Sequence, residues 1–278
     1  MLVRQHCQQV LFCLAWFGIC HISSTSSSPS AVPIDMGTTL VAIKYGSGVV
    51  VAADSRTSVS GYVSHRYASK IVPVSNDAVI CRSGSAADTQ RIAIETQEEI
   101  SRRMYRYGIN LSISQIAHWI RSVVYGQNGS LSVSLIVAGY DHEKQAARIF
   151  SITPSGALIE ENVFVVAGSG STYVLGHLDH NLSPSTAGKT DDLTESAAVS
   201  LCKQAIELAI HRDGSSGGLV RLFVIDSAGR RELTFPPCSA VTSNKHANND
   251  KENSPRLFGF AAPERTINTG SSRGANKR

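Results

Sequence analysis

Two neighbouring threonines, Thr38 and Thr39, follow Gly37 at the start of an apolar stretch, and Thr38 is the first candidate for chemistry. A threonine hydroxyl is a weak nucleophile until a base lies beside it, and the α-amine of the same residue can be that base. This arrangement requires cleavage after Gly37, where the lack of a side chain leaves the carbonyl open to attack. The dipeptide is also a good strand start, and on its own that structural explanation is the simpler one.

Two charged residues at strand ends could act on such a hydroxyl. Asp54 ends the stretch GVVVAAD and could hold a nearby amine or hydroxyl, or it could cap a turn. Lys70 precedes the apolar stretch IVPV. A lysine that pointed inward there would be desolvated and useful beside a hydroxyl, whereas one that pointed outward would be solvated. For each residue alone, the structural role is the more common one.

Three segments rich in glycine and serine lie at the junctions between expected elements. Residues 81–88 (CRSGSAAD) lead from a strand into a helix through Gly84, whose backbone N–H could stabilise an oxyanion. Residues 167–171 (AGSGS) and 212–218 (RDGSSGG) present further polar side chains: Ser169, Asp213, Ser215 and Ser216. No Walker motif, GxGxxG motif or zinc-ligand spacing accompanies them. Each segment could also be an ordinary turn.

The apolar pattern predicts the elements that must position these residues. Short β-branched runs predict strands at 38–46, 48–54, 70–74, 77–82, 131–140, 147–152, 157–159, 162–167, 219–226 and 231–234. Helical spacing predicts helices at 86–107, 112–125 and 193–211. Three histidines are expected in polar loops: His142, His177 and His180. The order of strands and helices predicts an α+β fold, in which two packed sheets are covered by helices.

Composition and charge limit the class of protein. Hydrophobic residues make up 42% of the chain and charged residues 17%, which is enough apolar material for a large core. The formal net charge is +4, and the residues from Pro236 onward, with seven Lys or Arg and three Asp or Glu, account for all of it. The rest of the chain is neutral overall, so a basic surface for nucleic acid is not supported.

The two ends of the chain differ from its middle. Residues 10–20 (VLFCLAWFGIC) are too few to span a bilayer as a helix, and they fit either a signal peptide or an apolar pro-segment equally well. The six cysteines show no CxxC pair, which favours a reducing compartment. Residues 236–278 are rich in Asn, Ser, Gly and charge and are expected to be disordered, or to order only on a partner.

Taken together and in order, the segments GTTLVAIKYGSGVVVAADSR, SKIVPV, CRSGSAADTQ, VAGSGS and RDGSSGG resemble the catalytic β-type subunits of the proteasome core particle. The resemblance covers about residues 37–235, and the spacings of 16 residues from Thr38 to Asp54 and 32 to Lys70 also agree. It implies a four-layer αββα sandwich of the N-terminal-nucleophile hydrolase type. It further implies three parts: a pro-segment at 1–37 that is removed on maturation, the hydrolase domain at 38–235, and the tail at 236–278.

The resemblance also assigns roles to residues. It implies cleavage between Gly37 and Thr38, with Thr38 as the nucleophile of a threonine-type endopeptidase and no cofactor. The other implied catalytic residues are the pair Asp54 and Lys70, Arg56 as support for the lysine, Gly84 in the oxyanion hole, and the set Ser169, Asp213 and Ser216 around the threonine amine. Thr39 is expected to be an ordinary strand residue.

A substrate pocket is implied as well. Arg82 matches the floor of the S1 pocket, where a guanidinium would pair with an acidic side chain. Other matching positions are mostly small or neutral: Thr57, Ala68, Val72, Ala86 and Gln90. The chain therefore resembles the caspase-like, post-glutamyl-hydrolysing type.

The family also implies an assembly and a location. The expected partners are other α- and β-type subunits in a four-ring core of 28 subunits, with unfolded polypeptides as substrates and neither nucleic acid nor membrane. The expected location is cytoplasm and nucleus, in place of the secretion suggested by the leader. Two alternatives stay open: a non-catalytic β-type subunit that only builds the ring, and another N-terminal-nucleophile hydrolase.

Overall fold

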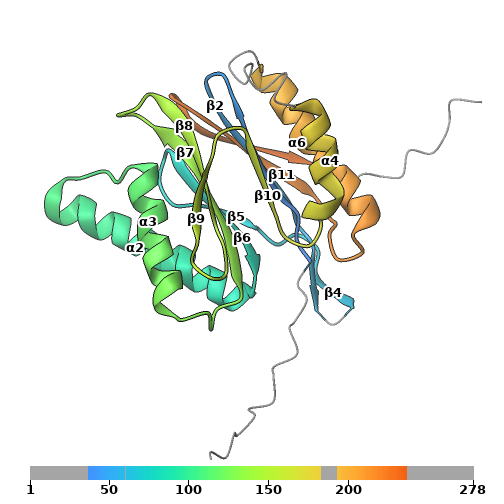
Figure 1. The fold of residues 1–278 in the computed structure, drawn as a ribbon, viewed down its shortest axis with the longest axis horizontal. Coiled ribbons are helices and arrows are strands. Elements are labelled where there is room, and N and C mark those ends of the chain that lie inside the picture. The colour runs from blue at the N-terminus through green and yellow to red at the C-terminus, as the bar shows by residue number, and fades with distance from the viewer. Residues whose placement is uncertain (1–36, 60, 183–192, 237–278) are drawn as a thin grey trace, which may run out of the picture. The chain divides into compact units, whose positions relative to one another are not determined.

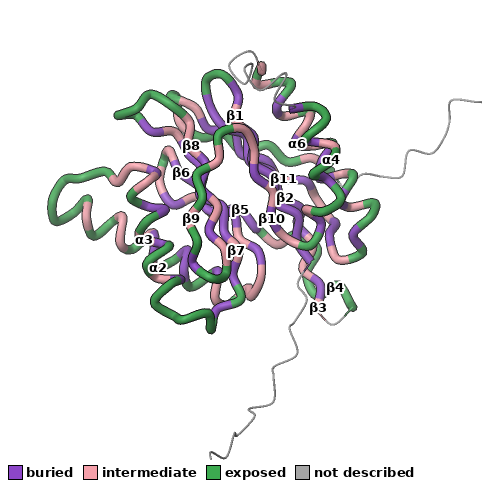
Figure 2. Tube along the Cα trace, viewed as in Figure 1, coloured by how far each residue is buried: buried purple, intermediate pink, exposed green. Residues whose placement is uncertain are grey.

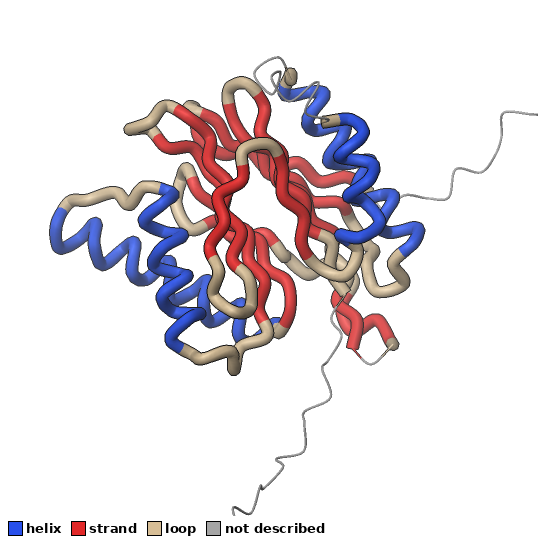
Figure 3. The backbone as a smooth tube through the Cα atoms, in the orientation of Figure 1, coloured by secondary structure: helices blue, strands red, loops and turns tan. Residues whose placement is uncertain are grey.

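A computed structural model describes residues 37–59, 61–182 and 193–236 of the protein. The predictions for residues 1–36 of the leader and 237–278 of the tail concern residues outside these ranges. Along the described chain, six strands are followed by two helices, four strands, two helices and two strands. The strands lie in the middle of the described part, with helices on either side (Figure 3). No helix within the described ranges is long and apolar enough to cross a bilayer. The fold is a mixed α/β arrangement.

Two five-stranded antiparallel sheets and one hairpin contain all the strands of the described residues. The first sheet has the order β10 (Phe164–Ala167), β1 (Leu40–Tyr45), β2 (Gly48–Asp54), β11 (Val220–Asp226) and β12 (Gly229–Phe235). The second has the order β5 (Ile71–Pro73), β6 (Ala78–Gly84), β7 (Val133–Asp141), β8 (Ala146–Ile152) and β9 (Leu158–Glu161). The hairpin pairs β3 (Thr57–Val59) with β4 (Tyr62–His65).

Four helices lie beside the sheets in the described part of the chain (Figure 1). They are α2 (Ala86–Tyr107), α3 (Ile113–Gly126), α4 (Ser171–Asn181) and α6 (Glu195–Arg212). Side chains at three helix starts accept backbone N–H groups that have no partner inside the helix. These N-caps are Ser85 for α2, Ser112 for α3, which forms a capping box with Gln115, and Thr194 for α6.

Alternation along the strands divides the core into three clusters. In β1, Val41 and Ile43 join a cluster with apolar residues of α4 and α6, whereas Leu40 and Ala42 join a second cluster with residues of the other sheet. The third cluster contains residues of α2, α3 and the strands β6, β7 and β8. Both faces of β1 and β2 are therefore buried (Figure 2). This double burial explains why these strands appear in the sequence as continuous apolar runs.

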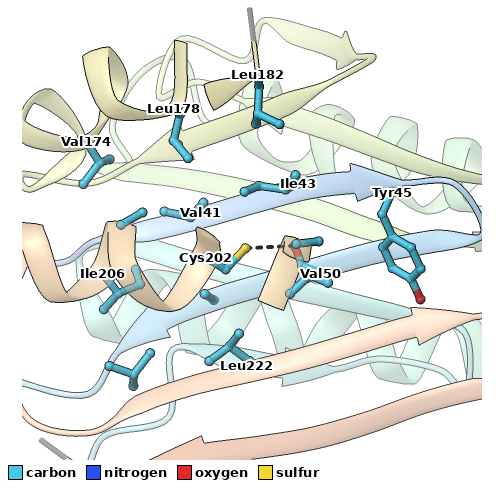
Figure 4. Packing of buried hydrophobic residues seen from close by; sticks show 14 of the residues in the cluster. Val41, Ile43, Tyr45, Val50, Val174, Leu178, Leu182, Cys202, Ile206 and Leu222 are labelled. Atoms are coloured by element: carbon cyan, nitrogen blue, oxygen red, sulfur yellow. Dashed lines mark hydrogen bonds between the residues drawn. The ribbon is translucent and has the colours of Figure 1, made fainter. Parts of the chain in front are cut away.

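Figure 4 shows the first cluster from close by. Val174 and Leu178 of α4 and Ile206 of α6 pack against Val41 and Ile43 of β1. Cys202 is fully buried in this cluster, and its Sγ lies 3.9 Å from the carbonyl oxygen of Val50. The second described cysteine, Cys81, is buried between the sheets, and both are free thiols.

The structure differs from the sequence prediction in several places. β1 begins at Leu40 rather than at Thr38, because the N–H groups of Thr38 and Thr39 donate to side chains instead of a neighbouring strand. The hairpin β3–β4 and the helix α4 were not predicted. The loop assignment of His177 and His180 was wrong, since both lie on α4.

Not every apolar residue of α2 lies on its buried face. Ile94 and Met104 are exposed. The buried residues of this helix are Thr89, Ile92, Ala93 and Thr96.

Candidate active site

The peptide bond between Gly37 and Thr38 lies at the centre of the site. The Oγ1 of Thr38 donates to the carbonyl oxygen of Gly37 at 2.8 Å, and the Nζ of Lys70 donates to the same oxygen at 2.8 Å. A Cβ added at position 37 would lie 1.8 Å from the Cβ of Ser215, so only glycine fits here. The carbonyl that precedes Thr38 is therefore contacted by a hydroxyl and by an ammonium group.

Asp54 holds Lys70 in this position. Asp54 is the last residue of β2, and its Oδ1 lies 2.7 Å from the Nζ of Lys70; the two side chains are 0% and 7% exposed. Three backbone N–H groups also donate to this carboxylate: those of Thr39 at 2.9 Å, Arg56 at 3.1 Å and Gly217 at 3.0 Å. Burial lowers the pKa of Lys70, and the negative charge of Asp54 partly opposes this shift. The result is a buried ion pair whose carboxylate is well supplied with donors.

A second carboxylate, Asp213, lies at the end of α6. Its Oδ2 accepts hydrogen bonds from the Oγ of Ser169 at 2.7 Å and from the Oγ of Ser216 at 2.6 Å, and its Oδ1 accepts from the N–H of Ser215 at 3.0 Å. The N–H of Thr38 donates to the Oγ of Ser169 at 3.1 Å. Burial alone would raise the pKa of Asp213, but the hydrogen bonds from Ser216 and Ser169 outweigh it and the pKa is lowered. Ser169 thus links the nitrogen of Thr38 to an ionised carboxylate.

The remaining predicted catalytic residues, Arg56 and Gly84, also lie at this site. The guanidinium of Arg56 donates to the carbonyl of Gly214 at 3.2 Å, so Arg56 contacts the lysine–aspartate pair through its backbone N–H. Gly84 is the last residue of β6 and has a φ of 98°, in the region that favours glycine. A Cβ added at Gly84 would lie 2.2 Å from the carbonyl oxygen of Ser132.

A cavity of about 370 Å³ lies against Thr38. It is lined by Gly37, Thr38, Thr57, His65, Ala68, Ser69, Lys70, Arg82, Gly84, Ala86, Thr89 and Gln90. Five of the six predicted S1 residues are among them. The sixth, Val72, lies half-buried on β5 and is not among the lining residues. The cavity therefore joins the predicted substrate pocket to the predicted nucleophile.

The cavity wall is cationic. Lys70 and Arg82 contribute positive charge, and the described residues that line the cavity include no carboxylate. An Nη2–H of Arg82 donates to the carbonyl of Ser69 at 2.5 Å. Burial lowers the pKa of Arg82, yet a guanidinium stays protonated near neutral pH. An anionic group entering the cavity would meet a favourable field.

Sequence reasoning did not assign a role in this site to Thr39, nor to the cavity residues His65, Ser69 and Thr89. Thr39 was taken as an ordinary strand residue, but its side chain is fully buried and its Oγ1 lies 2.8 Å from the Oγ of Ser216. His65 lines the cavity at the end of β4, and its Nδ1 accepts the N–H of Tyr67 at 3.1 Å. No local sequence pattern marks His65 as a cavity residue. The hairpin that carries it, β3–β4, was not predicted either. No group of three His, Cys, Asp or Glu among the described residues is placed to hold a metal ion.

Fold and site together define a mixed α/β protein with a buried threonine, preceded by glycine, beside a lysine–aspartate pair. The family model "Proteasome subunit" matches residues 34–225. The probable proteasome subunit beta type-1 of Schizosaccharomyces pombe is 36% identical over 202 residues, which cover 73% of this chain and 85% of the relative. Proteasome subunit beta type-6 of Arabidopsis thaliana is 37% identical over 204 residues, covering 73% and 84%. Proteasome subunit beta type-1 of Saccharomyces cerevisiae is 34% identical over 204 residues, covering 73% and 90%.

The chain therefore belongs to the proteasome β-type subunit family, among homologues of types 1 and 6. Subunits of this family assemble with other proteasome subunits into the core particle.

Proposed function

We propose that this chain is a catalytic, threonine-type endopeptidase subunit of the proteasome core particle, made as a zymogen and cut between Gly37 and Thr38. One observation carries the proposal. The hydroxyl of Thr38 and the ammonium of Lys70 both donate to the carbonyl oxygen of the bond that would be cut. A subunit that only builds the ring would have no need for a buried lysine–aspartate pair at this bond, since such a pair is costly to desolvate.

Removal of the leader follows from this geometry. The Oγ1 of Thr38 attacks the carbonyl carbon of Gly37 and closes a five-membered ring, while the ammonium of Lys70 stabilises the oxyanion that forms. Breaking the C–N bond then gives an ester on Thr38, and the hydroxyl proton ends on the released nitrogen. Water hydrolyses the ester. The products are a leader that ends in the carboxylate of Gly37 and a chain that begins with the amine of Thr38.

The same groups serve in peptide hydrolysis. The α-amine of Thr38 takes the proton of Oγ1, and the alkoxide attacks the substrate carbonyl carbon to give a tetrahedral oxyanion. The C–N bond of the substrate then breaks, and the leaving nitrogen takes the proton from the ammonium of Thr38. Water hydrolyses the acyl ester that remains on Oγ1, which releases the second product and restores the hydroxyl. Lys70, held by Asp54, favours the alkoxide. Ser169, Asp213 and Ser216 keep the amine in place. The backbone N–H of Gly84 is assigned to the oxyanion hole, and Arg56 supports Asp54 through its backbone.

The substrate preference that we assign is for acidic residues before the cleaved bond. Arg82 and Lys70 make the wall of the cavity cationic, and small or neutral residues such as Ala68 and Ala86 leave room for a glutamate side chain. A charge-assisted hydrogen bond to a guanidinium would favour glutamate over its neutral isostere glutamine. This is the caspase-like type of activity.

The broader setting belongs to the same proposal. The subunit would act in the cytoplasm and nucleus on unfolded polypeptides in ATP- and ubiquitin-dependent degradation, inside rings built from α- and β-type subunits. The helices and sheets would form the four αββα layers of an N-terminal-nucleophile hydrolase.

Intact-mass measurement and N-terminal sequencing of the assembled particle test the proposal. The wild-type chain should begin at Thr38. Thr38→Ala should keep residues 1–37 and lose cleavage after glutamate. Thr194→Ala, which removes a hydroxyl that caps α6, is the matched control and should be processed normally. A wild-type particle whose chain keeps its leader would refute the catalytic role and favour a structural ring subunit.

The acidic preference needs a separate test with two peptides that differ only in glutamate or glutamine before the cleaved bond. Arg82→Ala should lower the ratio of their kcat/KM values by about tenfold or more, because a hydrogen bond to a charged group contributes about 1.5–3 kcal/mol. Arg91→Ala, which removes an exposed arginine paired with Glu95 on α2, is the control. An unchanged ratio in Arg82→Ala would remove the preference from the proposal.

A further inference from the structure

Thr39 makes contacts that an ordinary strand residue has no need to make. Its side chain is fully buried, its N–H donates to the Oδ1 of Asp54 at 2.9 Å, and its Oγ1 lies 2.8 Å from the Oγ of Ser216. Thr39 thereby contacts two clusters of polar residues. Through Asp54 it contacts the ion pair with Lys70, and through Ser216 it contacts the cluster that also contains Ser169 and Asp213.

The direction of the hydrogen bond between Thr39 and Ser216 follows from the chemistry of the groups. An ionised carboxylate only accepts, so the short contact of 2.6 Å between Ser216 and Asp213 uses the single hydroxyl proton of Ser216. Ser216 must then accept from its other neighbour, and the hydroxyl of Thr39 is the donor. A directed chain of hydrogen bonds runs from Thr39 through Ser216 to Asp213, where it meets a second chain from the N–H of Thr38 through Ser169.

Gly170 lies directly against this hydroxyl. A Cβ added at Gly170 would lie 2.0 Å from the Oγ1 of Thr39. Gly170 is the N-cap residue of α4 and has a φ of −78°, a conformation that any residue can adopt. Its lack of a side chain is therefore needed for space rather than for backbone freedom. The second glycine of the segment AGSGS thus makes room for Thr39, beside the serine that contacts Thr38.

We propose that the hydroxyl of Thr39 is a positioning group for catalysis: it fixes the orientation of Ser216 and, through Ser216, the carboxylate of Asp213 that holds Ser169 against the nitrogen of Thr38. This inference rests on the proposed function. Thr39 touches neither substrate nor the attacking oxygen. None of Thr39, Ser216 and Asp213 lines the cavity, so loss of the hydroxyl should change the rate of the chemical step and leave substrate binding nearly unchanged.

The test compares Thr39→Val with Thr39→Ser in the assembled particle. Valine keeps the β-branched shape and the N–H bond to Asp54 but removes the donor, whereas serine keeps the donor. With a peptide that ends in glutamate, Thr39→Val should lower kcat by about three- to tenfold, the range expected for loss of one hydrogen bond, with KM within about twofold of wild type. Thr39→Ser should restore kcat to within about twofold. The rates are normalised to the fraction of chains that intact mass shows to begin at Thr38.

A double-variant cycle shows whether Thr39 acts through Ser216. Thr39→Val combined with Ser216→Ala should be no slower than Ser216→Ala alone, because both changes interrupt the same chain of hydrogen bonds. Losses that multiply would overturn the proposal. So would a Thr39→Val particle with wild-type kcat, a Thr39→Ser particle as slow as the valine variant, or an effect on KM alone.

Two further outcomes can be distinguished: a Thr39→Val variant that does not assemble, and a wild-type particle that is inactive. If Thr39→Val fails to assemble, Gly170→Ala displaces the same hydroxyl from its other side and should reproduce the loss of kcat; an unchanged kcat there would overturn the proposal. A wild-type particle that keeps its leader and does not cleave after glutamate would refute the proposed function, and the positioning role with it. In every outcome that overturns the positioning role alone, the wild-type particle is active.

Discussion

Replacing Lys70 by methionine should damage this protein in two separable ways. Methionine fills a similar volume, but it leaves the carboxylate of Asp54 buried without its cation. Breaking a buried ion pair in this way costs about 3–5 kcal/mol. Three backbone N–H groups still donate to Asp54, from Thr39, Arg56 and Gly217, so the lower end of this range is expected, about 3 kcal/mol. The same change removes the ammonium that lies 2.8 Å from the carbonyl oxygen of Gly37.

The first effect is local and can be measured by amide hydrogen exchange in the assembled particle. A loss of about 3 kcal/mol corresponds to roughly a hundredfold faster exchange in β2, where local opening exposes the amides. The second effect is measured by intact mass, as retention of residues 1–37. The control is Lys203→Met on α6, which removes a lysine that is 39% exposed and lies 3.8 Å from Glu207. A surface pair of this kind contributes about 0–1 kcal/mol, so neither readout should change much.

Combining Lys70→Met with Asp54→Asn separates the two effects. The amide that replaces the carboxylate of Asp54 in the double variant is neutral, so no unpaired charge is buried. Much of the protection of the β2 amides from hydrogen exchange should therefore return. Processing should stay blocked, because no ammonium contacts Gly37. The reasoning would be refuted if Lys70→Met lost its leader at the wild-type rate, or if its exchange in β2 matched that of the Lys203→Met control.

Three other predictions follow from the site and the core. Cys81 and Cys202 should resist alkylation in the native particle and react on unfolding, because both are buried and burial raises the pKa of both thiols. Peptide mapping by mass spectrometry measures the labelling, and alkylation of either cysteine in the native particle would contradict the prediction. Gly84→Ala should lose most activity, since a φ of 98° and a carbonyl 2.2 Å from the new Cβ cost about 1–3 kcal/mol of strain; wild-type kcat would contradict this. Because burial lowers the pKa of Lys70 from its ordinary value of 10.5, its ammonium is lost at a lower pH than in an exposed lysine. The kcat/KM profile should therefore fall on the alkaline side before pH 10.5, and a flat profile up to that pH would count against a role for the ammonium.

The sequence allowed most of the fold to be predicted. The helix at 112–125, which buries apolar residues at helical spacing, and the continuous β-branched runs of β1 and β2 were found because burial imposes a pattern on the side chains. The helix α4 and the hairpin β3–β4 were missed because their local patterns are weak. α4 has Gly176 in its middle and buries only Val174 and Leu178, and all four residues of β4 are exposed. Packing against α6, rather than local propensity, accounts for α4.

For the site, the sequence by itself determined the order, types and spacing of Thr38, Asp54 and Lys70, and a glycine before the threonine. Each of these residues alone also had a simpler structural explanation. The prediction of cleavage after Gly37 came from the resemblance of the ordered segments to proteasome β-type subunits. The tertiary structure decided which atoms meet. It placed the ammonium of Lys70 within hydrogen-bond distance of the carbonyl oxygen of Gly37. It also added His65, Ser69 and Thr89 to the residues that line the cavity, and it left Val72 out of them.

Thr39 shows the physical reason for this division. Its neighbour Ser216 is 177 residues away along the chain, and no local pattern reports a hydrogen bond between segments so far apart. The sequence determines that a residue has a hydroxyl. Only the pairing of β2 with both β1 and β11 brings that hydroxyl to the loop that follows α6, where its partner lies.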